Sequence, residues 1–351
     1  MSTKSFFLLI LLAFSSLLFS QKKKDMNLFI ITIDGLRWQE VFKGLDQDVM
    51  KLKSTKGNLN NLENIYPSRE ALMPFFWNTF AKNAAVYGNR SLNSKVEVAN
   101  PYVFSYPGYS ELLTGYVDKN ISSNQYPENP NSNILDFLNS TKEYKDKVVA
   151  FGAWNTFGNI LNAEKSSYPT FYAFKPYVNP KSSQAELINK MNQQSFKPWF
   201  KGEALDVFIH AMVMDYLETN KPKAVFISYG EPDEWAHSLN YRYYVDGIKN
   251  IDIFLEEIWN FVQNTEGYKD NTAILLTTDH GRGLLEQWGS HGGDIPNSNE
   301  IWFALYHPNI KEKGELKNTN TIYLKELAPT LSQILGKDFK AEHPVSSPIK
   351  K

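Results

Sequence analysis

Residues 277–293 (TTDHGRGLLEQWGSHGG) concentrate side chains that could bind a metal ion. They contain the adjacent pair Asp279 and His280, a further His291 and five glycines. The preceding run, residues 271–278, is apolar and rich in β-formers, which predicts a buried strand that ends at the acidic pair. Ligands of open α/β sheets bind outside the carboxyl ends of the strands. We therefore expect a metal site at this strand end.

A second run of β-formers, residues 27–34, ends in a carboxylate. Asp34 is followed by Gly35 and by an expected helix over residues 37–42. The pattern predicts a buried strand that delivers Asp34 to its carboxyl end. The same position would also suit a cap at the start of the helix, and the residues alone leave both interpretations open.

A third strand is predicted over residues 223–229, and acidic residues and a histidine follow it directly. Asp233 and His237 are four residues apart, so they face the same side if a helical turn forms there. In that arrangement both can bind one metal ion. An ordinary ion pair on a helix surface would have the same spacing.

Residues 104–115 (FSYPGYSELLTG) predict a helix with Pro107 in its first turn and Gly115 at its end. Ser105 is then expected just before the helix start, where backbone N–H groups and the helix dipole favour an anion. The alternative is that Ser105 simply caps the helix. Ser110 is a rival nucleophile by residue type.

Two loops are expected near such a site. Residues 118–131 are rich in Asn, Ser and Pro, and Asn124 could present an amide donor there, although most Asn in such loops make turns. Residues 166–183 predict an aromatic loop without clear periodicity, whose rings line a substrate entrance or pack in the core.

The remaining patterns complete an α/β chain. We expect one domain over residues 21–351, with loop insertions at about 44–101 and 160–200. Further strands are predicted over residues 147–152 and 301–306, and helices over 72–85, 202–218, 241–263 and 324–335.

Composition narrows the chemistry. The 351 residues include 37 Lys and Arg against 38 Asp and Glu, without a basic face, which argues against nucleic-acid binding and favours a small-molecule partner. Cysteine is absent, so disulfides, thiolate nucleophiles and thiolate metal sites are excluded. A transition-metal site must use carboxylates and the six histidines.

Residues 1–20 have the pattern of a secretory signal peptide. Lys4 precedes an apolar stretch over residues 6–19, and the small Ser20 precedes a charged run. This apolar stretch is shorter than the roughly 20 residues that span a bilayer, which disfavours a retained anchor, and no later segment is long enough. We expect an exported protein, periplasmic or secreted, without a transmembrane segment after signal removal.

Parallel strands would bring these scattered ligands to one edge of a sheet. Six nitrogen and carboxylate ligands suffice for two divalent ions, and Ser105 would add an alkoxide. In such a paired site, one ion activates the attacking oxygen and the other stabilises the leaving oxygen of an in-line displacement at phosphorus. The ligand candidates are Asp34, Asp233, His237, Asp279, His280 and His291.

This pattern resembles the alkaline phosphatase superfamily, and within it the type I phosphodiesterase/nucleotide pyrophosphatase branch. Five pieces match in the family's order and span most of the chain. They are Ile33-Asp34-Gly35, Ser105-Tyr-Pro with Leu-Thr-Gly115, Glu231-Pro-Asp233-x-x-x-His237, Thr278-Asp279-His280-Gly281 and His291-Gly292.

The resemblance implies a three-layer sandwich with a mostly parallel central sheet and helices on both faces. It also implies two Zn²⁺ ions and a role for each ligand. Asp233, His237 and His291 would hold one zinc, and Asp34, Asp279 and His280 would hold the other, with Ser105 as nucleophile on the second. The branch commonly has Thr at the position of Ser105, and its phosphate-binding Asn corresponds to Asn124 only if two residues are deleted.

The expected function is an exported two-zinc hydrolase of phosphoric esters that works through a phosphoseryl intermediate. The diesterase is favoured by the branch, and a phosphomonoesterase is the first alternative. Sulfatase activity is disfavoured because no Cys or suitably placed Ser could become formylglycine, and a phosphomutase fits poorly with export. A non-catalytic metal-binding protein is the contrasting class. Arg282 either neutralises substrate charge or forms a salt bridge.

Overall fold

The computed structural model describes residues 25–350. The expected signal peptide, residues 1–20, lies outside the described residues. Within residues 25–350, none of the helices combines the length and the apolar character needed to cross a bilayer.

The described chain alternates strands and helices. The strands are β1 (Asn27–Ile33), β2 (Ala85–Tyr87), β3 (Val96–Glu97), β4 (Val148–Gly152), β5 (Thr170–Tyr172), β6 (Ala224–Tyr229), β7 (Thr272–Thr277), β8 (Glu300–Ile301), β9 (Phe303–Tyr306), β10 (Gly314–Glu315) and β11 (Ile322–Tyr323). The α-helices are α2 (Trp38–Lys43), α3 (Gln47–Lys51), α4 (Leu62–Ile65), α5 (Arg69–Leu72), α6 (Ala81–Asn83), α7 (Ser105–Thr114), α8 (Ile134–Ser140), α9 (Phe157–Ile160), α10 (Ala185–Gln194), α11 (Asp206–Asn220), α12 (Glu231–His237), α13 (Tyr241–Asn264) and α14 (Leu327–Ile334). A π-helix, η1 (Phe76–Phe80), and the 3₁₀ turns η2 (Arg90–Leu92), η3 (Leu285–Gln287) and η4 (Leu324–Glu326) complete them.

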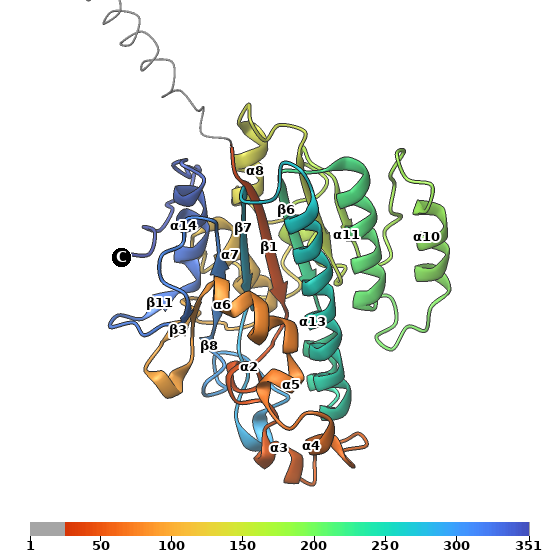
Figure 1. Ribbon diagram of the computed structural model, residues 1–351, viewed down its shortest axis with the longest axis vertical. Coiled ribbons are helices and arrows are strands. Elements are labelled where there is room, and N and C mark those ends of the chain that lie inside the picture. The colour runs from red at the N-terminus through yellow and green to blue at the C-terminus, as the bar shows by residue number, and fades with distance from the viewer. Residues whose placement is uncertain (1–24, 351) are drawn as a thin grey trace, which may run out of the picture.

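The main sheet is eight-stranded, in the order β10-β2-β9-β7-β1-β6-β4-β5, and a smaller sheet has the order β11-β3-β8. Strand β1 lies between β6 and β7 and is parallel to both (Figure 1). Its register pairs Ile33 with Tyr229 and Thr32 with Thr277. The three strands therefore end side by side at one edge of the sheet, as the sequence predicted.

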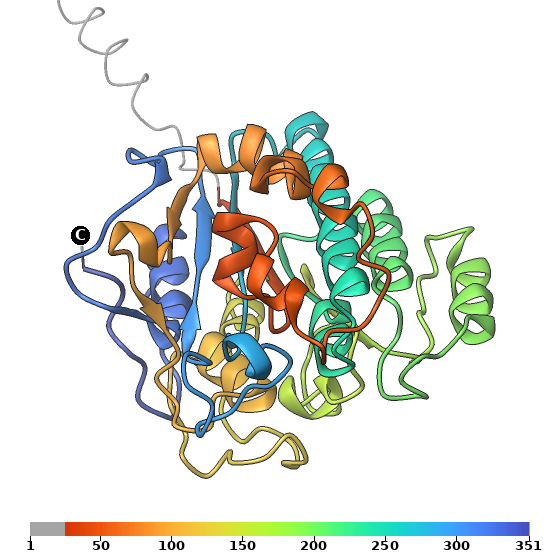
Figure 2. The same ribbon diagram turned by 90° about the horizontal axis from the view of Figure 1, so that it is seen from below.

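Helices cover both faces of the sheet (Figures 1 and 2). Alternate residues of β1 point to opposite faces. Phe29 and Ile31 pack into a core shared with α11 and α13, whereas Leu28 and Ile30 pack into a second core shared with α7, α8 and α14. The expected three-layer α/β arrangement with a mostly parallel sheet is confirmed.

The helix predicted over residues 72–85 is wrong in part. Helix α5 ends at Leu72, a π-helix follows at Phe76–Phe80, and Ala85 already belongs to strand β2. Pro74 explains the break, because proline lacks the N–H that a continuous helix needs and its ring clashes with the preceding turn.

Three further segments differ from the expectation. Residues 301–306 do not form one strand, because β8 pairs in the small sheet and β9 in the main sheet. The predicted loop over residues 166–183 contains the edge strand β5. Residues 44–101 contribute β2 to the main sheet and β3 to the small one. These strands are only two to four residues long, too short for an alternating pattern to be seen in the sequence.

Helix α7 packs closely against the end of β7 through Gly108. A Cβ atom at this position would lie 2.5 Å from the backbone oxygen of Asp279. On α13, a Cβ atom at Gly247 would have no neighbour nearer than 3.8 Å. The two helical glycines thus differ in the space around them.

We expect Gly108→Ala to destabilise the protein by about 1–3 kcal/mol, because the added methyl group forces α7 away from the strand end. Gly247→Ala is the matched control and should be neutral or stabilising by up to about 1 kcal/mol, because alanine favours a helix. Urea denaturation of both variants measures the difference. Equal stabilities would show that α7 is not held at this distance.

Candidate metal centre

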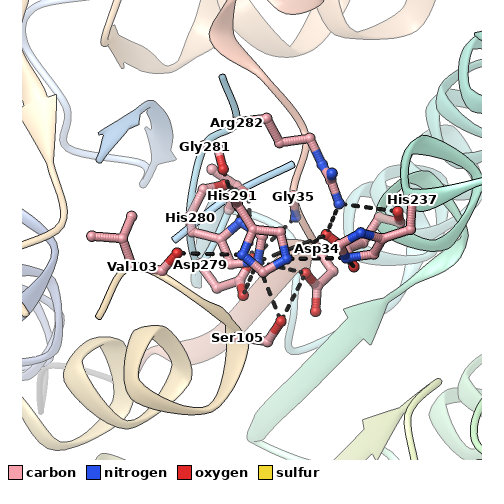
Figure 3. Close-up of polar contacts among 12 residues, drawn as sticks. Asp34, Gly35, Val103, Ser105, His237, Asp279, His280, Gly281, Arg282 and His291 are labelled. Atoms are coloured by element: carbon pink, nitrogen blue, oxygen red, sulfur yellow. Dashed lines mark hydrogen bonds and ion pairs between the residues drawn. The ribbon is translucent and has the colours of Figure 1, made fainter. Parts of the chain in front are cut away.

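All the predicted ligands meet at the carboxyl ends of β1, β6 and β7. Figure 3 shows Asp34, His237, Asp279, His280 and His291 close together. Asp34 follows β1, Asp233 and His237 lie on α12 after β6, and Asp279 and His280 follow β7. Two groups have ligand atoms within 4.8 Å of one another. One comprises Asp34, Asp279 and His280, and the other comprises Asp233, His280 and His291.

The first group surrounds the predicted nucleophile. The Ser105 hydroxyl oxygen lies 3.2 Å from His280 Nε2 and 3.5 Å from Asp34 Oδ1. His280 Nδ1 is 2.9 Å from the carbonyl oxygen of Gly281, so it donates there and the lone pair of Nε2 faces the group. This is the tautomer that a metal ligand requires.

The second group is more open to solvent. His237 Nε2 lies 3.0 Å from Asp233 Oδ2 and 3.0 Å from His291 Nε2. His291 Nε2 is also 3.9 Å from Asp233 Oδ1. The side chain of His237 is 44% exposed, whereas that of Asp233 is mostly buried. His280 belongs to both groups, and its Nε2 lies 3.7 Å from Asp233 Oδ1, so the two groups adjoin. His237 lies beside the second group rather than within it.

The capping alternatives are not what the structure places at these positions. The N-cap of α7 is Phe104, and Ser105 is the first residue of the helix rather than the residue before it. The N-cap of α2 is Arg37, and Asp34 instead accepts a hydrogen bond from Tyr109. Neither N-cap residue, Arg37 or Phe104, makes a side-chain cap bond to its own helix. The Ser105 hydroxyl and the Asp34 carboxylate therefore remain directed toward the other candidate ligands.

Asn124 lies at the start of α7. Its Oδ1 accepts a hydrogen bond of 2.9 Å from the backbone N–H of Tyr106. The Asn124 amide therefore lies beside Tyr106, the residue after Ser105, and its Oδ1 is already bonded to the backbone of α7. Ser110, the rival nucleophile, instead accepts a hydrogen bond of 3.0 Å from Asn129 Nδ2.

Burial of several carboxylates in one place perturbs their titration. Burial raises the pKa of Asp34 well above its usual value, and the charges of Asp279 and Asp233 raise it further. The pKa of Asp279 is raised, first by burial, although His280 opposes the shift. Burial lowers the pKa of His291 well below its usual value, and the neighbouring His280 adds to this effect.

Arg282 compensates one of the carboxylates. Its guanidinium forms a buried ion pair with Asp233 Oδ1 and a hydrogen bond of 2.6 Å to the carbonyl oxygen of Gly289. Burial works to raise the pKa of Asp233, but Arg282 and then His237 outweigh it and hold this pKa well below the usual range. Of the two roles expected for Arg282, the salt bridge is the one present.

The side chains fit a pair of divalent ions. Asp279 Oδ2 is buried and has no hydrogen-bond partner among the described residues. Buried carboxylates beside imidazole nitrogens with free lone pairs form a donor set that suits zinc and similar ions. A cation at the centre would satisfy Asp279 Oδ2 and relieve the repulsion between the carboxylates.

Tyr109 was missed in the sequence, and Gly35 was named there only as part of a motif, without a role. The Tyr109 hydroxyl donates to Asp34 Oδ2 at 3.0 Å, which orients this carboxylate. Tyr109 is one helical turn after Ser105, so the spacing of four residues on the predicted helix was an available signal. Gly35 has φ of +58°, and a Cβ atom there would lie 2.4 Å from Asp233 Oδ1. Only glycine fits between these ligands.

A model of the metalloenzyme superfamily matches residues 43–338 of the chain. The chain is also similar to the 2,3-bisphosphoglycerate-independent phosphoglycerate mutase of Ureaplasma urealyticum serovar 10 (strain ATCC 33699 / Western), with 28% identity over 128 residues. The matched region covers 36% of this chain and 23% of that protein. The corresponding mutase of Gracilaria tenuistipitata var. liui is 28% identical over 123 residues, or 34% of this chain and 22% of that protein. The match thus spans less than a quarter of either curated relative.

Solved structures share the fold. A putative sulfatase from Bacteroides thetaiotaomicron VPI-5482 has a TM-score of 0.58 at 14% identity, covering 92% of this chain and 73% of that chain. The phosphonate monoester hydrolase of Agrobacterium radiobacter has a TM-score of 0.57 at 13% identity, covering 92% and 76%. A protein in the alkaline phosphatase superfamily from Vibrio parahaemolyticus has a TM-score of 0.52 at 14% identity, covering 90% and 68%.

The raised pKa of Asp34 makes the stability of the metal-free protein depend on pH. The folded state holds a proton on Asp34 that the unfolded state releases near pH 3.9, so this contribution is lost as the pH rises through the folded pKa. Relative to Asp34→Asn, the chelated wild type should therefore lose stability as the pH rises above about 4.

Denaturant titrations of both proteins at several pH values measure this difference. Zn²⁺ at about 100 times its dissociation constant should stabilise the wild type by about 2.7 kcal/mol and the variant by less. A difference between the two chelated proteins that stays constant with pH would contradict the expectation.

Proposed function

This chain belongs to the metalloenzyme superfamily, and we propose that it is an exported two-metal hydrolase of phosphoric esters. The proposed subclass is the type I phosphodiesterase/nucleotide pyrophosphatase-like branch of the alkaline phosphatase superfamily, and the proposed ions are Zn²⁺. The motifs around Asp34, Ser105, Asp233 and Asp279 support this choice.

One observation carries the proposal. The Ser105 hydroxyl stands at the first residue of α7, within hydrogen-bonding distance of His280 Nε2 and at the edge of the group formed with Asp34. A hydroxyl held at a helix start, among ligands for a divalent ion, is placed to act as a nucleophile on an anionic ester.

Each residue of the site has a separate role in the proposed reaction. Ser105 Oγ attacks phosphorus, the leaving alcohol departs from the opposite side, and water then cleaves the phosphoseryl intermediate. Asn124 and the start of α7 hold non-bridging oxygens of the substrate. Tyr109 keeps the Asp34 carboxylate oriented. Two divalent ions, when bound by the six ligands, would lower the pKa of the Ser105 hydroxyl and stabilise the charge on the attacking and leaving oxygens.

A phosphomonoesterase of the same superfamily is the first alternative, since it would use the same nucleophile and ions. A phosphomutase is the second, and the partial similarity to phosphoglycerate mutases favours it. A mutase would pass the phosphoryl group from Ser105 to a second alcohol instead of to water. Release of inorganic phosphate or a phosphomonoester into water distinguishes hydrolysis from such transfer.

We expect Ser105→Ala to lower the kcat for matched aryl phosphate mono- and diesters by at least about a thousandfold, because the covalent route is lost. Metal content, measured by mass spectrometry, should stay nearly unchanged. Ser110→Ala is the matched control on the same helix and should retain activity, since Ser110 is bonded to Asn129. Wild-type protein with zinc bound that turns over neither ester would refute the hydrolase.

Asn124 offers a second test. Asn124→Asp keeps an oxygen for the Tyr106 N–H but replaces the amide donor with a negative charge, so it should preserve the fold and lower kcat/KM by about ten- to a thousandfold. Asn129→Asp is the matched control, because Asn129 lies in the same loop but bonds to Ser110. Equal effects of the two substitutions on kcat/KM would show that Asn124 has no role in substrate binding.

A further inference from the structure

Exposed apolar side chains concentrate in residues 175–201, which we call the arm. In the described part of the chain, thirteen large hydrophobic residues are exposed, and five of them belong to the arm. Phe196 and Phe200 are 79% and 86% exposed, and Leu187 and Met191 are 57% and 52% exposed. Val178, at 66%, is the fifth. This local enrichment of exposed apolar side chains makes the arm a candidate interaction surface.

The arm is also basic, within a nearly neutral chain. It contains five lysines and a single acid, Glu186, whereas the whole chain has 37 Lys and Arg against 38 Asp and Glu. The lysines are Lys175, Lys181, Lys190, Lys197 and Lys201. The partner of this surface must therefore be both apolar and negatively charged.

The arm is held in place by its inner side. Asn179 Nδ2 donates to Asp215 Oδ2 on α11 at 3.0 Å, and the buried Asn192 on α10 donates to the carbonyl oxygen of Ala173 at 2.9 Å. Leu187 and Met191, four residues apart on α10, share the outer face. Figures 1 and 2 show α10 beside α11 at the periphery of the molecule. The exposed rings thus belong to a folded element.

The end of the arm packs against α12, the helix that carries Asp233 and His237. The rings of Trp199 and Trp235 are 4.8 Å apart, and Trp235 lies on α12 between Asp233 and His237. Phe200 follows Trp199 directly and has φ of +57°, a conformation that bulky residues rarely adopt. This backbone presents the ring to solvent within a few residues of the contact with α12.

We propose that the arm docks on the surface of an anionic lipid bilayer. Phenylalanine side chains among lysines, with almost no acid, match the interfacial segments that insert rings at the headgroup level and pair lysines with anionic lipids. A second copy of this chain fits less well, because a symmetric contact would bring the two sets of lysines together. Docking does not require turnover. With the proposed function, phosphoesters of the bound lipid surface would be candidate substrates.

The test is sedimentation of the purified protein, without residues 1–20, with vesicles at low salt. We expect binding to phosphatidylcholine vesicles that contain about 30% phosphatidylglycerol, and much weaker binding to pure phosphatidylcholine. Phe196→Ser/Phe200→Ser should weaken binding to the anionic vesicles by about tenfold or more. The control Ile65→Ser/Ile253→Ser changes exposed residues elsewhere and should leave binding unchanged.

A second pair of variants tests whether the lysines of the arm are needed for binding to anionic vesicles. Lys181→Gln/Lys190→Gln should weaken binding to anionic vesicles, whereas Lys311→Gln/Lys313→Gln, exposed lysines outside the arm, should not. Turnover of a water-soluble aryl ester should be equal in the wild type and in all four variants, which shows that the fold is intact.

Three results would overturn the docking surface. They are absence of vesicle binding by the wild type, equal binding by the Phe196→Ser/Phe200→Ser variant, and a dimer by light scattering that this variant abolishes. The last result would assign the arm to a second copy. Vesicle binding without turnover of any ester would refute the proposed hydrolase and leave the docking surface standing.

Discussion

Mutual repulsion between buried carboxylates is the constraint on which the site depends. Asp34, Asp233 and Asp279 lie within one cluster, and each is at most 8% exposed. Charges of one sign repel strongly where water is excluded, so the cluster must take up protons or cations. The pKa values of Asp34 and Asp279 are raised, which favours uptake of protons when no metal is bound. Histidine nitrogens directed toward the same space allow a metal cation to bind there instead of protons.

The fold holds this unfavourable cluster together with interactions made elsewhere. Strand β1 is fully paired on both sides with β6 and β7, and its two faces lie in two large apolar cores. The strand ends cannot separate without breaking this sheet. Glycine then sets the finer spacing, because Gly35 leaves room for Asp233 and Gly108 lets α7 approach Asp279. The stability of the sheet thus keeps the mutually repelling carboxylates together at its edge.

The sequence predicted the parts of the site that local patterns determine. Buried runs of β-formers locate the ends of β1, β6 and β7, and the residues that follow them are the candidate ligands. Contacts between distant segments have no such pattern, so the partner of Tyr109, which is Asp34, and the partner of Arg282, which is Asp233, needed the structure. Short strands such as β2 and β8 also escaped prediction, because their state is set by tertiary pairing.

Arg282 makes the two ligand groups electrostatically unequal. It already neutralises Asp233, whose pKa is held low, whereas Asp34 and Asp279 have no comparable cation from the chain among the described residues. An ion entering beside Asp233 therefore meets a carboxylate that is ionised but shared with a guanidinium. An ion entering beside Asp34 meets two carboxylates that no guanidinium within residues 25–350 compensates, so its binding competes with protonation of these groups.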